Sequence, residues 1–186
     1  MKTSFVYLLV LFHFLAIKVK GQTIKVTYER KPNIEYQLRN VMDPVHKESI
    51  TNHLISNQKV YELSVSQDRS LFEVVGNIDL YNPGFIDESN TGLILKNIST
   101  KEMLISKSLD GKKYLIKDSI PTFNWKIFDE FKTINGIKCQ KATTFENDIL
   151  LTAWFVRKPE YNRIGPEYYG MKNALIMELQ RPSFTF

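Results

Sequence analysis

Side chains that commonly carry catalysis are few in this sequence. Of its three histidines, His46 and His53 lie seven residues apart, which puts them on one face of a helix but about 10 Å apart along its axis. That distance is too long for both to bind one metal ion, because helical metal ligands are typically four residues apart. The single cysteine, Cys139, stands in a strand-like stretch between Lys138 and Gln140 and is typical of a small, partly buried apolar residue. We therefore expect no metal site and no cofactor.

Carboxylates are the remaining groups that could do chemistry. Glu167 or Glu178 could act with Asp129 or Glu130, because two carboxylates about 5–9.5 Å apart in a cleft can serve a hydrolase or transferase. Glu178 follows the apolar residues 174–177, which would bury it and raise its pKa. The sequence has no motif for a nucleophilic serine, a phosphate-binding loop, a dinucleotide fold or a zinc protease. A carboxylate-based periplasmic enzyme is therefore the alternative to a protein without catalytic residues.

A long irregular segment, residues 158–170, combines aromatic and cationic side chains. These residue types on a loop are typical of an interaction surface. Together with Trp125 and Trp154, which we expect on a continuous apolar concave face, the segment supplies the candidate interaction residues Tyr161, Arg163, Gly165, Pro166, Tyr168, Tyr169 and Gly170. The other interpretation is that the tyrosines fold back and cover the open end of a sheet, as large aromatic side chains often do.

The elements that must position these residues are mostly strands. Apolar and polar side chains alternate in residues 23–29, 34–38, 60–66 and 71–75, which predicts half-buried strands. Residues 43–58 have a loose helical spacing after Asp43-Pro44, a pair suited to the start of a helix. Residues 77–91 have no sustained period and are expected to form a loop.

Three hairpins are predicted in the second half of the chain. Asp110-Gly111 and Asn135-Gly136 each lie between apolar runs and suit the positive φ angles of a tight hairpin turn. A third turn is expected at residues 146–148. Successive hairpins with at most a short helix predict a mainly β protein, formed by a single curled antiparallel sheet or an open barrel.

Residues 1–21 have the three parts of an export signal. Lys2 provides the positive start, residues 5–17 are almost entirely apolar, and Gly21 is small enough to precede a cut. The apolar run is too short to cross the ~30 Å core of a bilayer. We expect residues 22–186 to form a single β-rich domain in the periplasm or outside the cell, with no membrane span; an uncleaved anchor is the competing interpretation.

The basic character of the chain belongs largely to this signal. The whole chain has 25 basic and 20 acidic residues, but residues 1–21 contain three lysines and no acid, which leaves a net charge of +2. No run of more than two basic residues follows, and nucleic-acid binding needs a concentrated basic footprint. We therefore expect no nucleic-acid partner.

Several blocks in the second half form a recognisable pattern. Residues 132–143 read K-T-I-N-G-I-K-C-Q-K-A-T, residues 153–155 read A-W-F, and residues 109–118 read as a hairpin around D-G-K. This order resembles the GLPGLI family of exported Bacteroidota proteins, which has a K-x-I-x-G-y-x-C-x-K-A-t block followed by an A-W-[FY] strand. The resemblance covers about residues 60–179.

The sequence departs from that family in its eponymous motif. The chain has Gly170-Met171-Lys172-Asn173-Ala174-Leu175-Ile176 in place of G-L-P-G-L-I. The proline and the second glycine are missing, although Asn173 is the residue that, after glycine, best tolerates the positive φ of a tight turn. The resemblance implies an exported protein without an assigned activity and an association with TonB-dependent outer-membrane transporters.

From these observations we expect a non-enzymatic envelope protein. A curled sheet can hold a lipid or peptide in an apolar groove, so its partner would be a hydrophobic ligand or an outer-membrane transporter. Asp118-Ser119-Ile120 also resembles a short acceptor for O-glycosylation of exported proteins, which makes Ser119 a candidate modification site.

Overall fold

The computed structural model describes residues 23–56, 58–77, 92–109, 111–158 and 161–186. These residues form one 11-stranded antiparallel sheet, which confirms the predicted mainly β class. The strands are β1 (Ile24–Pro32), β2 (Lys59–Ser66), β3 (Arg69–Asn77), β4 (Leu93–Asn97), β5 (Glu102–Leu109), β6 (Lys112–Ser119), β7 (Lys126–Ile134), β8 (Ile137–Glu146), β9 (Ile149–Arg157), β10 (Ala174–Gln180) and β11 (Phe184–Thr185). Their order is β6-β5-β4-β3-β2-β1-β11-β10-β9-β8-β7.

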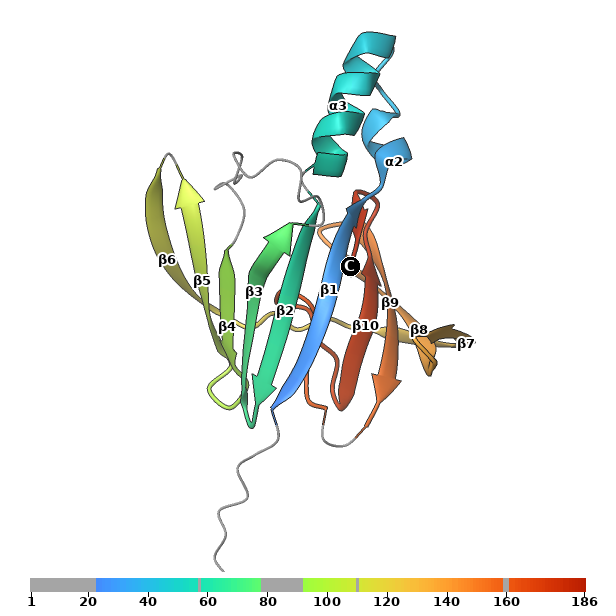
Figure 1. Ribbon diagram of the computed structural model, residues 1–186. Coiled ribbons are helices and arrows are strands. Elements are labelled where there is room, and N and C mark those ends of the chain that lie inside the picture. Colours follow the sequence, from blue (N-terminus) through green and yellow to red (C-terminus); the bar gives the residue numbers. More distant parts are fainter. Residues whose placement is uncertain (1–22, 57, 78–91, 110, 159–160) are drawn as a thin grey trace, which may run out of the picture.

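The sheet is strongly curled because its two edge strands are neighbours in the chain. β6 and β7 lie at opposite edges, yet only residues 120–125 join them. Eleven flat strands would be about 48 Å across, whereas a fully extended connection of this length reaches only about 25 Å. Figure 1 shows the connection running behind the sheet from β6 to β7. The curl therefore gives the sheet a concave side, which the connection crosses.

The core lies on the concave side of the sheet. β2 shows why, because every second residue is buried: Tyr61, Leu63 and Val65 face the core. The rings of Tyr61 and Phe72 stack with centroids 4.8 Å apart, and the ring of Phe186 meets Tyr61 edge-on at 5.5 Å. These aromatic rings thus join two distant parts of the chain in one core.

The predicted hairpins are present at the expected residues. Asn135 and Gly136 have φ angles of 48° and 78°, and Gly111 has φ 72°, all in the left-handed region that such turns require. Asn147 and Asp148, at the third predicted turn, have φ 48° and 64°. Local turn chemistry therefore sets the register of the strands that follow.

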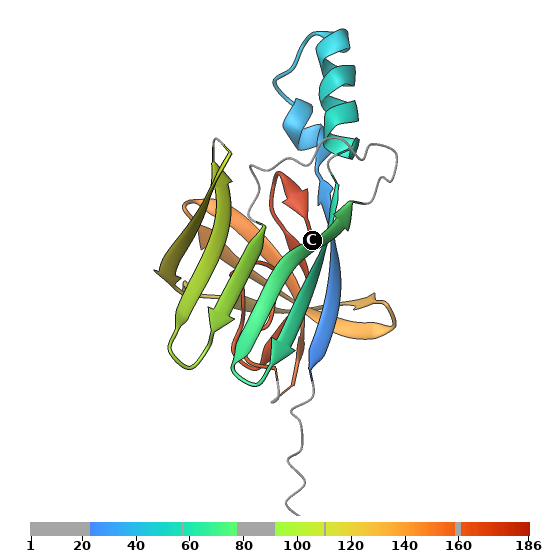
Figure 2. The ribbon, with the colours of Figure 1, turned by 60° about the vertical axis from the view of Figure 1, so that its left-hand side comes forward.

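Two helices interrupt the strands between β1 and β2. α3 (Pro44–Ser56) confirms the predicted helix, and the Asp43 carboxylate caps it by accepting hydrogen bonds from the backbone N–H groups of Val45 and His46 at 2.7 and 3.0 Å. His46 and His53 are both exposed on this helix. Figures 1 and 2 show both helices projecting beyond the end of the sheet.

The prediction of a strand at residues 34–38 is wrong. These residues form α2 (Ile34–Leu38), because the Asn33 side chain accepts a hydrogen bond from the Tyr36 N–H at 3.1 Å and starts a helical turn. Neither described helix has the length and apolar character that a membrane span needs. The predicted export signal at residues 1–21 lies outside the described residues, as do all but the first residue of the predicted loop at 77–91.

Candidate functional site

Residues 161–170, the described part of the aromatic loop before β10, are folded against the sheet. Ile164 donates its backbone N–H to the carbonyl oxygen of Ala174 at 3.2 Å, and Ile176 donates to the carbonyl oxygen of Ile164 at 2.9 Å. Gly165 and Pro166 are buried, and Tyr169 is fully buried. These three candidate interaction residues therefore belong to the interior, as the folded-back interpretation predicted, and they are not part of a free surface.

Two glycines allow this loop to double back on itself. A Cβ atom on Gly170 would lie 2.5 Å from the carbonyl oxygen of Arg163, and one on Gly165 would lie 2.8 Å from the carbonyl oxygen of Tyr169. Both distances are too short for any residue with a side chain. The glycines at these positions are thus required by close backbone approach.

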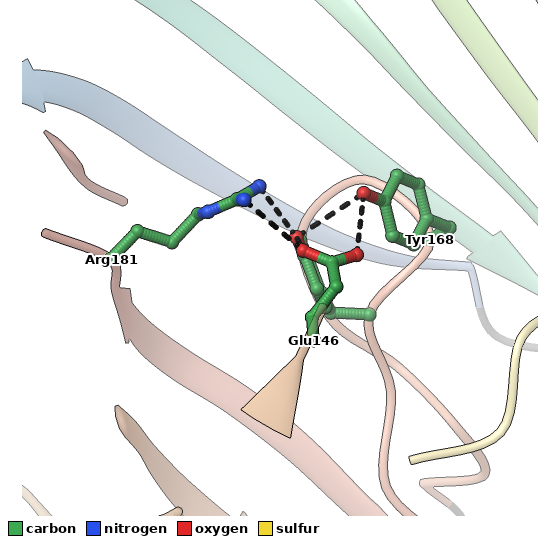
Figure 3. A network of polar contacts seen from close by, with 4 residues as sticks. Glu146, Tyr168 and Arg181 are labelled. Carbon is green, nitrogen blue, oxygen red and sulfur yellow. Dashed lines mark hydrogen bonds and ion pairs between the residues drawn. The ribbon is translucent and has the colours of Figure 1, made fainter. Parts of the chain in front are cut away.

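A polar network holds the loop from one side. The carboxylate of Glu146 on β8 accepts hydrogen bonds from the hydroxyls of Tyr168 and Tyr169 at 2.9 and 2.8 Å. A guanidinium nitrogen of Arg181 lies 3.2 Å from the same carboxylate, and another donates to the Tyr169 hydroxyl at 2.9 Å. Figure 3 shows these groups converging from β8, the loop and the end of β10. Because the Glu146 and Arg181 side chains are only 15% and 19% exposed, the network is largely shielded from water.

Titratable groups around this network have shifted pKa values. Burial raises the pKa of Glu167, while the positive charges of Arg30 and Arg181 oppose that shift. Burial also raises the pKa of the Tyr169 hydroxyl, and its hydrogen bonding with Tyr168 adds to the effect. On β4, burial lowers the pKa of Lys96 to about 8; its ammonium lies 3.5 Å from the Tyr169 carbonyl oxygen.

Two of the four carboxylates proposed for an enzyme lie in ion pairs. Glu178 forms an ion pair with Lys132 at 2.6 Å, and Glu130 forms one with Lys141 at 2.8 Å. Glu178 pairs in register with Trp154, on the face of the sheet turned away from the core. No group of three or more His, Cys, Asp or Glu side chains within the described residues could hold a metal ion.

The two tryptophans do not share one concave face, so that expectation is wrong. In β9 the residues on either side of Trp154, Ala153 and Phe155, are buried in the core. Strand alternation therefore turns Trp154 outward, where the ammonium of Lys132 lies 4.6 Å from its ring. Trp125 packs against the core instead.

Trp125 lines an open pocket with a cavity volume of about 640 Å³. The pocket forms where the connection to β7, the end of β9 and the turn before β10 meet. Its apolar lining consists of Phe123, Trp125, Ile127 and Met171. Its polar lining consists of Asn124, Lys126, Arg157, Lys172 and Asn173.

Long-range contacts fix the walls of this pocket. The indole N–H of Trp125 donates to the Gly170 carbonyl oxygen at 3.1 Å, and the Thr144 hydroxyl donates to the Asn124 carbonyl oxygen at 3.1 Å. The turn of residues 171–174 is closed by a hydrogen bond from the Ala174 N–H to the Met171 carbonyl oxygen at 3.2 Å. Asn173 takes φ 53° in this turn, a conformation that asparagine tolerates better than most residues.

Among the residues proposed as an interaction surface, the structure brings only Trp125 into this pocket. Tyr161 and Arg163 precede the buried part of the loop, and Tyr168 belongs to the Glu146 network. Sequence reasoning missed Phe123, Arg157 and Lys172, which come from three separate segments. No local spacing connects them, because the curl of the sheet brings them together.

The fold matches known structures although the sequence does not. No protein-family model matches the chain, and no curated protein matches its sequence. The chain is similar to two crystal structures of PNGF-II, in space groups C2 and P21, with TM-scores of 0.57 and 0.55 and sequence identities of 16% and 17%. The match covers 89% of this chain but only 26% and 27% of PNGF-II, so this chain spans about a quarter of that protein. Similarity at this level of identity establishes the fold alone.

Proposed function

We propose that this chain is an exported, non-enzymatic envelope protein that binds a small hydrophobic ligand or peptide. The pocket around Trp125 carries this proposal, because its volume of about 640 Å³ lies in the range typical of small-molecule sites. The apolar lining includes two aromatic rings, Phe123 and Trp125, whose centroids are 6.1 Å apart. Aromatic side chains that contact the ligand, together with polar groups that fix its orientation, are usual in a ligand pocket.

A neutral fluorescent probe tests this proposal directly. N-phenyl-1-naphthylamine should bind the chain, and Ile127→Gln, which adds a polar group to the pocket lining, should weaken that binding. Ile137→Gln is a matched control, because Ile127 and Ile137 are 43% and 42% exposed and both lie on strands, but Ile137 is not in the pocket. Equal affinity of the two variants, or no binding by the original chain, would contradict the proposal.

Export is the second part of the proposal and needs its own measurement. The three-part pattern of residues 1–21 supports it. The intact mass of the protein purified from its host envelope should correspond to a chain that begins at Gln22. The same spectrum tests Ser119, which is exposed at the end of β6, for O-glycosylation. Native mass spectrometry of that sample would show whether a ligand is carried from the cell.

Partnership with a TonB-dependent transporter is a second candidate role. The GLPGLI-like blocks at residues 132–143 and 153–155 favour it, and these blocks lie in β7, β8 and β9. A photo-crosslinker at the exposed position Phe145, on the same strands, should then capture an outer-membrane transporter in the host envelope. Crosslinks only to other proteins, or no crosslinks at all, would contradict the partnership with a transporter and would not affect the ligand-binding proposal.

The carboxylate-based enzyme receives less support. Two of its proposed groups, Glu178 and Glu130, lie in ion pairs with lysines. A carboxylate that accepts a hydrogen bond from a lysine ammonium has part of its hydrogen-bonding capacity already used.

A further inference from the structure

The pocket around Trp125 has three cationic groups at its edge. Lys126 stands at the start of β7, Arg157 at the end of β9, and Lys172 in the turn before β10. All three residues are exposed. Their charged groups are therefore accessible to a ligand that enters from solvent. They come from three separate elements and line one pocket, so they do not form a run along one strand.

These cations differ from six basic residues elsewhere in the described structure, which lie in ion pairs. Across the described residues, Lys25, Lys31, Lys117, Lys132, Lys141 and Arg181 each have a carboxylate within 3.2 Å. None of the ion pairs found there includes Lys126, Arg157 or Lys172, and no Asp or Glu among the described residues lines the pocket. The pocket therefore combines an apolar lining with positive charge that the described acids do not neutralise.

The remaining polar groups of the pocket suit an anion as well. Asn124 and Asn173 add amide donors to the lining. A guanidinium such as that of Arg157 presents its donors in a planar fork that matches the two oxygens of a carboxylate. Phe123, Trp125, Ile127 and Met171 would contact an apolar tail or ring, so the two parts of the pocket match the two parts of an amphiphile.

We propose that the pocket around Trp125 takes an anionic amphiphile, a small molecule with a carboxylate at one end and an apolar body at the other. This inference rests on the proposed ligand-binding function and narrows it to a chemical class. Arg157 is the main partner of the carboxylate, with Lys126 and Lys172 adding long-range attraction. The apolar body lies against Trp125 and Phe123.

The test compares ligands of one chain length that differ only in the head group. Decanoate, decanol and decylamine are titrated at pH 7.5 into the Trp154→Phe variant, in which Trp125 is the remaining tryptophan and reports on the pocket. Decanoate should bind about tenfold more tightly than decanol, the gain expected from a charge-assisted contact, and decylamine should bind more weakly than either. Inorganic phosphate alone should not compete at the same concentration.

Charge-removing variants then locate the effect. Arg157→Gln in the same background should remove most of the preference for decanoate over decanol, and the triple variant with Lys126→Gln and Lys172→Gln should abolish the preference. Lys113→Gln is the matched control, because it removes an exposed positive charge from β6, which does not line the pocket. Circular dichroism of each variant checks that the sheet is intact.

The outcomes separate this inference from the function on which it rests. If decanoate and decanol bind with equal affinity, or if Lys113→Gln lowers decanoate binding as much as Arg157→Gln, the anionic class is wrong while a hydrophobic pocket stands. If phosphate competes as well as decanoate, the site is a plain anion patch and the inference fails. If neither these ligands nor the neutral naphthylamine probe binds, the proposed function fails with it.

Discussion

The indole N–H of Trp125 and the carbonyl oxygen of Gly170 form a hydrogen bond of 3.1 Å between two segments without regular structure. One segment crosses from β6 to β7, and the other folds against β10. Each segment is long enough to move if left unattached. Their contact therefore gives the pocket a wall of fixed position, which a binding site needs in order to select its ligand.

The first prediction concerns the backbone at Gly170. Gly170→Ala should lower the free energy of unfolding by about 1–3 kcal/mol, because the added Cβ would lie 2.5 Å from the Arg163 carbonyl oxygen and force the loop outward. The same movement should lengthen the Trp125 hydrogen bond. Urea unfolding and the emission of Trp125 in the Trp154→Phe background measure the two effects.

Gly76→Ala is the control for this substitution. Gly76 lies in β3, and a Cβ there would meet nothing within 4 Å. It should leave stability and Trp125 emission almost unchanged, since a side chain suits a strand at least as well as glycine does. If both variants lose stability equally, close backbone approach is not what makes Gly170 necessary.

The second prediction concerns the shielded charges of the Glu146 network. Glu146→Gln should lower the free energy of unfolding by about 2–3 kcal/mol, because the Arg181 guanidinium then loses its ion pair and two tyrosine hydroxyls lose a charged acceptor. Thermal and urea unfolding measure the loss. The double variant Glu146→Gln/Arg181→Met should recover part of it, since it no longer contains an unpaired charge.

An exposed ion pair provides the comparison for the Glu146 and Arg181 variants. Glu130, whose side chain is 52% exposed, pairs with Lys141 at 2.8 Å. Glu130→Gln should cost less than about 1 kcal/mol, as surface ion pairs generally do. Equal losses from Glu130→Gln and Glu146→Gln would show that the network contributes no more than a surface contact.

Local signals in the sequence predict most of the strands and all three hairpin turns. Alternation at residues 23–29 and the Asn135-Gly136 pair depend only on neighbouring residues, so they can be read without knowledge of the fold. The strand predicted at residues 34–38 fails for a local reason too, because the cap formed by Asn33 outweighs a short alternation. Such a five-residue pattern contains too few positions to separate a strand from a helical turn.

The pocket, in contrast, depends on contacts between distant segments. Phe123 and Arg157 lie 34 residues apart. No motif in the residues between them predicts the curl of the sheet that brings both into one pocket. The outward position of Trp154 is set by its register beside Ala153 and Phe155, which alternation does indicate. The expectation that Trp125 and Trp154 share one face is wrong because Trp125 precedes its strand and donates a hydrogen bond to the Gly170 carbonyl oxygen. No sequence pattern predicts this contact.

The third prediction concerns the turn of residues 171–174, which precedes β10. Asn173 has φ 53°, a conformation that costs most residues about 1 kcal/mol or more. Asn173→Gly should therefore be neutral or slightly stabilising, while Asn173→Ala should destabilise the protein by about 1 kcal/mol. Chemical unfolding of the two variants gives the comparison, and an alanine variant as stable as the glycine variant would mean that the turn relaxes to another conformation.

The last prediction follows from the buried ammonium of Lys96. Its pKa is lowered by burial to about 8 in the folded protein, against an ordinary value of 10.5 when unfolded. Between these values the unfolded chain binds more protons than the folded one, so stability should rise with pH. From pH 7 to pH 9.5 the contribution of this lysine amounts to about 2 kcal/mol. Below about pH 8 both states are protonated and the effect levels off.

Comparison with Lys96→Met isolates that contribution from groups that act in the opposite sense. Burial raises the pKa values of Cys139, Tyr28 and Tyr169, so the folded protein keeps their protons longer and loses stability as alkaline pH ionises them in the unfolded chain. These terms are common to both proteins and cancel in the difference. Lys96→Met should be the more stable protein at pH 7, and its advantage should shrink by about 2 kcal/mol by pH 9.5. An advantage that stays constant in urea unfolding with reductant across this range would show that Lys96 keeps its ordinary pKa in the folded state.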